Sequence, residues 1–190
     1  MAPFDRTHIS EVEHVIKAPA SRWDKKIAAD LISEMEAFFG KVDTIPQMKQ
    51  ALAIAGYQGL QRQIEKAVEG KTHLDAVRAM ALAMRSFALG SPGLAVASFR
   101  DPDVDNPEYQ KAAGQLAQVV LRVFGDAGVN GEAARHAIRI LKSLVRGFVL
   151  NEMSAPVARP IEYQKSYVFA VEMFVRGLSE LQDLPLRKEA

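Results

Sequence analysis

The chain has 190 residues, of which 48% are hydrophobic and 25% are charged, and it contains no cysteine. These values are typical of a folded globular domain and exclude wholesale disorder, a disulfide framework and thiolate chemistry. A formal net charge of +1 gives no global attraction to nucleic acid or to anionic lipid. The first residues lack the apolar core of a secretory signal, and no apolar run reaches the roughly 18 residues of a membrane span. We therefore expect a cytoplasmic protein with no membrane partner.

Helical periodicity runs through almost the whole chain. No segment alternates between apolar and polar residues over the length of a strand, so the sequence predicts an all-α protein. The first periodic segment carries Ile9, Val12 and Ile16, and the second can be one helix or two, which brings the expected total to about nine. In chain order, the predicted helical segments are 9–16, 24–42, 44–69, 72–90, 93–99, 107–124, 130–153 and 162–181.

Capping and breaking residues define several of these boundaries. Thr44 with Pro46, Thr72, and Asn106 with Pro107 are typical of helix N-termini, where a side-chain oxygen caps and proline occupies the first turn. Glycine at 70 and at 90 is typical of helix ends. Pro156 and Pro160 separate the last two helices.

The last two predicted helices, 130–153 and 162–181, are apolar over more than one face. A surface helix needs only one apolar stripe, about 100° wide. A chain of this length has room for little more than one core, so a second copy of the chain is the economical way to cover the additional face. The sequence therefore predicts a homodimer, and the residues chosen for its interface are Leu144, Phe148, Tyr167, Phe174 and Leu178.

Three stretches of the chain resemble the TetR family of bacterial regulators. They are QALAIAGYQGL at 50–60, MRSFALGSPGLAVASF at 84–99, and the terminal pair IRILKSLVRGFVLNEM and YVFAVEMFVRGL. The middle stretch contains Phe, four further residues and then Pro-Gly-Leu at a helix corner, which is a recurring family pattern. The resemblance implies a small N-terminal unit of three helices with a helix-turn-helix in residues 1–45. Residues 46–190 would form an effector-binding and dimerisation domain.

The resemblance also implies that a small apolar effector binds between the middle helices. The alternative is that the same residues simply fill a core, and methionine suits either role. His136 is the candidate polar group of such a pocket, and the alternative for it is a partly exposed position on the solvent side of its helix. The predicted pocket residues are Tyr57, Met80, Met84, Phe87, Phe99, Leu116, Val120, Phe124 and His136.

The N-terminal region departs from the family pattern. Residues 27–31 align with the first helix of the helix-turn-helix, and residues 38–42 align with the end of the recognition helix. However, Ile32 stands where the family has its turn glycine, and Lys41 stands where it has its signature histidine. Because residues 25–39 contain no Gly, Pro or Asn, one continuous helix fits as well as two. Operator DNA binding would depend on four cations, namely Lys25, Lys26, Lys41 and Lys49.

Acidic residues oppose these cations. Residues 1–50 hold seven basic residues against eight acidic ones, and Glu34 and Glu36 occupy positions where base-reading residues are expected. Carboxylates can accept from cytosine, but two of them near Asp30 would mostly repel the phosphate backbone. The sequence is therefore compatible both with specific operator binding and with its loss.

Three functions fit the sequence. The first is a ligand-responsive homodimeric repressor, in which an effector changes the separation of the two DNA-binding units. The second is a relative without operator binding that binds a ligand or forms heterodimers. The third is a helical enzyme or carrier of an apolar metabolite. The sequence contains no catalytic motif, no metal-ligand spacing and no phosphate-binding glycine loop, so we expect no enzyme, no metal and no cofactor.

Overall fold

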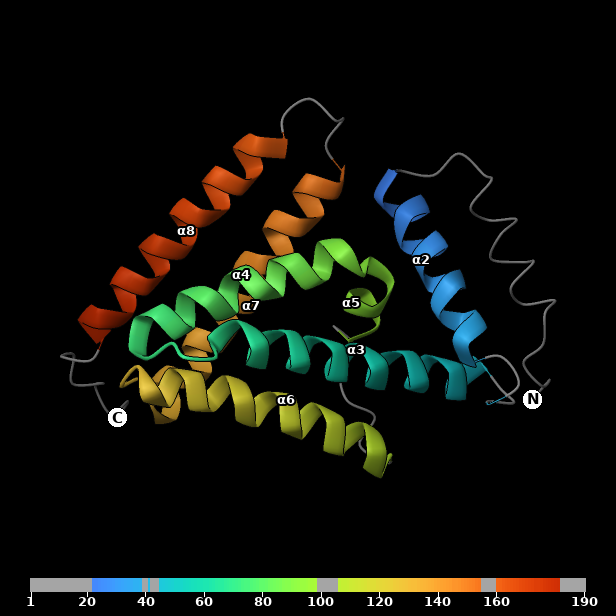
Figure 1. Cartoon of the computed structure of the whole chain (residues 1–190), viewed down its shortest axis with the longest axis horizontal. Coiled ribbons are helices and arrows are strands. Elements are labelled where there is room, and N and C mark those ends of the chain that lie inside the picture. Colours follow the sequence, from blue (N-terminus) through green and yellow to red (C-terminus); the bar gives the residue numbers. More distant parts are fainter. Residues whose placement is uncertain (1–21, 39–40, 42–44, 99–105, 155–159, 182–190) are drawn as a thin grey trace, which may run out of the picture.

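A computed structural model of the chain describes residues 22–38, 41, 45–98, 106–154 and 160–181. These residues form only helices and the turns between them, which confirms the predicted all-α class (Figure 1). The helices are α2 (Arg22–Phe38), α3 (Ile45–Val68), α4 (His73–Gly90), α5 (Pro92–Ser98), α6 (Pro107–Asp126), α7 (Gly131–Ser154) and α8 (Pro160–Leu181).

The described part of the chain contains seven helices, whereas about nine were predicted for the whole. The predicted first helix, at residues 9–16, lies outside the described residues. The segment that could be counted twice is α2, which is one unbroken helix of 17 residues from Arg22 to Phe38. No residue between these two positions breaks a helix, so its backbone hydrogen bonds continue through Ile32 without interruption.

Several predicted helix boundaries are confirmed. The Asn106 side chain accepts a hydrogen bond from the backbone N–H of Tyr109 at 3.0 Å, and Pro107 follows in the first turn of α6. Gly70, just beyond the end of α3, has a left-handed φ of 68°, which glycine adopts without steric cost. Thr72 occupies the N-cap of α4 with extended backbone, but its hydroxyl makes no capping hydrogen bond.

Helix α4 is at the centre of the packing. It contacts α3, α5, α6, α7 and α8, and Figure 1 shows it between the layer of α3 with α6 and the pair α7 and α8. Val77, Met80 and Ala81 are completely buried. These contacts combine the middle helices and the terminal pair into one continuous hydrophobic core.

Helix α2 packs against α5, and also against α3 and α7. The Asp30 carboxylate accepts a hydrogen bond of 2.6 Å from the backbone N–H of Gly93, in the first turn of α5. A Cβ atom on Gly93 would lie 2.8 Å from the backbone nitrogen of Leu31, so this close approach requires glycine. Met35 and the half-buried Ile32 add apolar contacts with the core.

Within the described residues, none of the helices is by itself long and apolar enough to span a membrane. Helices α4 and α5 meet the length and composition criteria only when taken together, and they bend by 115° at their junction.

Candidate functional site

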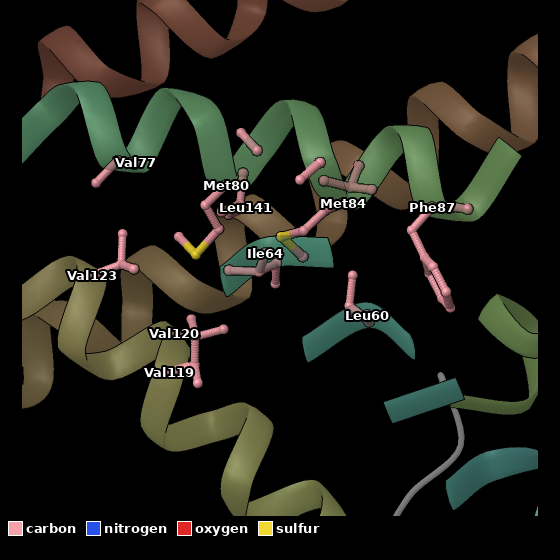
Figure 2. Close-up of a cluster of buried hydrophobic side chains, with 14 of the residues drawn as sticks. Leu60, Ile64, Val77, Met80, Met84, Phe87, Val119, Val120, Val123 and Leu141 are labelled. Carbon is pink, nitrogen blue, oxygen red and sulfur yellow. The ribbon is translucent and has the colours of Figure 1, made fainter. Parts of the chain in front are cut away.

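Most of the predicted pocket residues lie together in the core. Met80 and Met84 extend from α4 toward α3 and α6, where Figure 2 shows them beside Ile64 with Val120 below Met80. Phe87 extends from the end of α4 toward Gly59 of α3. Phe124 and Met80 are completely buried, and Met84 and Phe87 are less than 10% exposed. The structure thus brings together the apolar residues that the sequence selected on α4 and α6.

Tyr57 belongs to a second, smaller cluster with Tyr109, Ala53 and Ala112. The two tyrosine rings meet edge to face with centroids 5.4 Å apart, and their hydroxyl oxygens are 3.2 Å apart. Leu116 packs against both clusters and therefore connects this tyrosine pair to the main core. Phe99, the remaining aromatic residue of the predicted set, lies outside the described residues.

His136 does not join the other predicted pocket residues. Helical phase turns Ala134, Ala137 and Leu141 of α7 toward the core, so His136 faces outward and its side chain is 57% exposed. Its Nε2 lies 3.8 Å from a carboxylate oxygen of Glu132, one turn earlier on the same helix. The structure therefore gives His136 the alternative, solvent-facing position.

His136 lines a groove between α7 and α8, with a volume of about 520 Å³. Ile140 and Met173 form exposed parts of this groove. Gly177, on the α8 side of the groove, has no side chain to fill it. The groove is apolar apart from the imidazole. Its lining residues are Ala133, His136, Ala137, Ile140, Met173, Phe174, Gly177 and Leu178.

The residues chosen for the dimer interface mostly hold α7 and α8 against their own chain. Tyr167 and Leu178 are buried within the single chain, at 0% and 1% exposure. The Phe148 ring meets the Tyr167 ring edge to face at 5.3 Å, and the half-buried Phe174 meets Phe124 of α6 in the same way at 6.3 Å. The half-buried Leu144 also packs against the core. The apolar side chains exposed on these two helices are instead Ile140, Val168, Phe169 and Met173.

A largely buried polar network, which the sequence pattern did not predict, connects α4 to both terminal helices. The Arg85 guanidinium donates to both carboxylate oxygens of Glu152 in α7, at 2.8 and 2.6 Å from Nη2. The same guanidinium lies 5.4 Å from the ring centroid of Tyr167 in α8, in cation–π geometry. The Tyr167 hydroxyl donates to the backbone carbonyl of Ala81 at 2.6 Å. The sequence signal for this network is Arg85, a single arginine within the apolar run MALAMRSF.

The predicted DNA-contacting lysines lie on α2, on α3 and in the turn between these two helices. Lys41 and Lys49 are exposed. Lys25 and Lys26 lie in the first turns of α2. Glu34 is partly buried on the same helix, and this burial, together with the Asp30 carboxylate, raises the pKa of Glu34.

In the described part of the chain the architecture is purely helical, with α4 enclosed by the other helices and with a terminal pair of long helices. The family model described as "Tetracyclin repressor-like, C-terminal domain" matches residues 77–174, just over half of the chain. The chain therefore belongs to this family, as its resemblance to TetR regulators predicted.

Two further comparisons agree with this assignment. The chain is 31% identical over 137 residues to an uncharacterized HTH-type transcriptional regulator of Mycobacterium tuberculosis. That match covers 70% of this chain but only 63% of the relative. A solved structure of a protein with unknown function from Rhodococcus sp. RHA1 superposes with a TM-score of 0.61 over 90% of this chain and 93% of that one. At 17% identity, this second likeness concerns the fold.

Proposed function

We propose that this chain is a cytoplasmic, homodimeric member of the family that acts in the regulation of transcription, with α7 and α8 forming the dimer. The observation that carries the proposal is the outer face of these two helices. Ile140, Phe169 and Met173 are 52%, 67% and 61% exposed. Large apolar side chains gathered beside an apolar groove are typical of a protein–protein contact. The HTH-type regulator to which the chain is related supports the role in transcription.

Sedimentation of the wild-type chain and of the double variant Phe169→Glu with Met173→Glu tests the dimer. We expect a dimer for the wild type at micromolar concentration and a folded monomer for the variant, because its carboxylates would be desolvated at the interface. Leu121→Glu is the matched control, because Leu121 is an equally apolar residue that is 44% exposed on α6. A monomeric wild type would contradict the proposal.

Gly147 gives an independent test of the same interface. It lies in α7, is exposed, and has no atom within 4 Å of the position where a Cβ would be. In a single chain, Gly147→Ala should therefore stabilise the helix by about 1 kcal/mol. If a second copy packs closely against α7 at this position, the same change weakens the dimer instead. The dimer dissociation constant of this variant, measured against that of the wild type, distinguishes the two outcomes.

We further propose that the core around Met80, Met84, Phe87 and Phe124 receives a small apolar effector. Met80 and Met84 support this proposal, because flexible thioether side chains can repack around a ligand. A panel of hydrophobic compounds should contain members that raise the melting temperature, and Met84→Ala should change which members do so. If no compound shifts the melting temperature, the effector proposal is wrong.

Operator binding is the property on which two candidate functions differ. A helix-turn-helix requires a break between two helices, whereas α2 is unbroken from Arg22 to Phe38. Asp30 of this helix is also occupied by its hydrogen bond to Gly93. These observations oppose a helix-turn-helix within α2 itself, and for this described segment they support the second candidate, a relative that binds a ligand or forms heterodimers without reading an operator.

Selection of genomic DNA fragments at low and at physiological salt separates the two candidates. The second candidate predicts only weak, non-selective enrichment that disappears as salt rises, because few cations are available to neutralise phosphates. Sequence-selective enrichment that survives physiological salt would establish the operator-binding candidate. In that case Lys41→Ala should weaken binding, and Glu34→Gln with Glu36→Gln should strengthen it.

A further inference from the structure

An open groove of about 800 Å³ runs along α3 and α4, on a surface that neither the effector nor the dimer proposal uses. Helix α3 forms one wall, helix α4 forms the other, and Lys71 stands at the end where the chain turns between them. The lining residues are Gly59, Arg62, Gln63, Lys66, Ala67, Lys71, Ala79, Leu82, Ala83 and Ser86.

The charges on this α3–α4 groove have one sign. Arg62, Lys66 and Lys71 line it, and no carboxylate does. Among the residues that the structure describes, neither Arg62 nor Lys66 forms an ion pair. The Lys71 ammonium donates to the backbone carbonyl of Ala67 at 2.8 Å, which leaves its charge without a carboxylate partner there.

Two nearby acidic side chains have polar partners of their own, and the exposed Glu69 does not line the groove either. Glu65 accepts a hydrogen bond from Gln61 of the same helix, and Asp75 pairs with Arg78 at 2.7 Å. Neither carboxylate belongs to the lining of the groove. The cations of the groove therefore remain available to a negatively charged partner.

The floor of the α3–α4 groove is apolar and made of small residues. Gly59, Ala67, Ala79 and Ala83 contribute little side-chain volume, while Leu82 stands at the edge and is 44% exposed. Small side chains on two neighbouring helices allow the backbone of a third helix to approach closely. Leu82 offers such a helix an apolar contact.

We propose that the α3–α4 groove binds an acidic amphipathic helix of a partner protein. Arg62 and Lys66 are one helical turn apart, about 6 Å along the axis, so two carboxylates one turn apart on the incoming helix match them. An open groove buries too little of a small molecule to bind it tightly. The phosphate backbone of DNA would match the cations but would gain nothing from Leu82 and the alanine floor.

A fluorescently labelled helical peptide, with leucine and alanine on one face and glutamate at successive turns beside them, is the probe. Its binding is followed by anisotropy. We expect micromolar affinity for the full chain, reduced about ten-fold or more by Arg62→Glu with Lys66→Glu and about three-fold by Leu82→Gln. Lys111→Glu with Arg122→Glu, which changes two exposed cations of α6 outside the groove, is the matched control and should leave affinity unchanged.

A charge-reversed peptide, with lysine in place of each glutamate, makes the test specific to the groove. It should bind the variant carrying Arg62→Glu and Lys66→Glu better than it binds the wild type. Three results would overturn the proposal: no binding of the acidic peptide at millimolar concentration, equal loss in the α6 control variant, or no recovery with the reversed peptide. Competition by duplex DNA that is insensitive to Leu82→Gln would assign the groove to nucleic acid instead.

Discussion

Arg85 and Glu152, which are 67 positions apart in the chain, form an ion pair with three hydrogen bonds between the middle of α4 and the end of α7. Their side chains are only 12% and 16% exposed. Two charges at this depth stabilise a fold only while both are present, since each one alone would be left uncompensated. The pair therefore links α7 to α4, and the loss of either member leaves the other charge uncompensated.

Glu152→Gln should accordingly lower the free energy of unfolding by about 3 kcal/mol. The measurement is urea denaturation, and the control is Asp75→Asn, which removes the exposed partner of Arg78 and should cost less than about 1 kcal/mol. Replacing both members, with Arg85→Met and Glu152→Leu, should recover most of the loss. Equal losses for Glu152→Gln and Asp75→Asn would show that burial does not strengthen the pair.

Tyr167→Phe should lower the free energy of unfolding by about 1 kcal/mol, because it removes the hydrogen bond to Ala81 while keeping the ring contacts. The effect should depend on pH. Burial raises the pKa of the Tyr167 hydroxyl, an effect that the nearby Arg85 charge only partly offsets. The unfolded chain releases this proton near pH 10, whereas the folded chain retains it, so the wild type loses stability as the pH rises above about 10. The difference in the free energy of unfolding between wild type and Tyr167→Phe should therefore be smaller at about pH 11 than at about pH 8.

Gly93→Ala should destabilise the packing of α2 on α5 by about 2 kcal/mol. The added methyl group would lie 2.8 Å from both the Asp30 carboxylate and the Leu31 backbone nitrogen. The matched control is Gly114→Ala, at an exposed position of α6 with open space around the new Cβ. Because alanine favours helix more than glycine does, the control should gain up to about 1 kcal/mol. Opposite signs in thermal unfolding of the two variants are the expected result.

Glu34→Gln should raise the free energy of unfolding at neutral pH, because it removes a carboxylate that lies near Asp30. The gain should be only about 0.3 kcal/mol, since the side chain is partly solvated. Partial burial and the neighbouring Asp30 raise the pKa of Glu34. A raised pKa favours the protonated folded state, so the stabilisation is present at acidic pH and is lost as the pH rises past the folded pKa. The gain from glutamine should therefore disappear near pH 4, and a constant gain across pH would contradict this explanation. Glu36→Gln, on the exposed side of α2, is the control.

The helices themselves were largely predictable from local signals. Asn106 with Pro107 and the glycine at position 70 define helix ends through backbone chemistry that neighbouring residues already determine. Periodicity alone left α2 open, since one helix and two helices of the same phase place the same residues on the same face. The contacts of Asp30 with Gly93 resolve what α2 packs against, and they join residues 63 positions apart.

The candidate surfaces were harder to predict for a related reason. An apolar pattern on two sides of α8 indicates two buried faces, but it does not tell which face meets the chain itself. Tyr167 and Leu178 turned out to face inward, whereas Phe169 and Met173 face solvent. The sequence did not predict the ion pair of Arg85, because its partner Glu152 comes from a distant part of the chain.

The docking of α2 on α5 can be followed by the intrinsic fluorescence of the chain. Trp23, in the first turn of α2, is the single tryptophan of the protein. Its emission therefore comes from α2 alone, while the tyrosine absorbance reports on α3, α6 and α8, which carry Tyr57, Tyr109, Tyr163 and Tyr167. A titration in which the tryptophan signal changes before the tyrosine signal would mean that α2 detaches as a separate step, and coincident curves would mean that it melts together with the core.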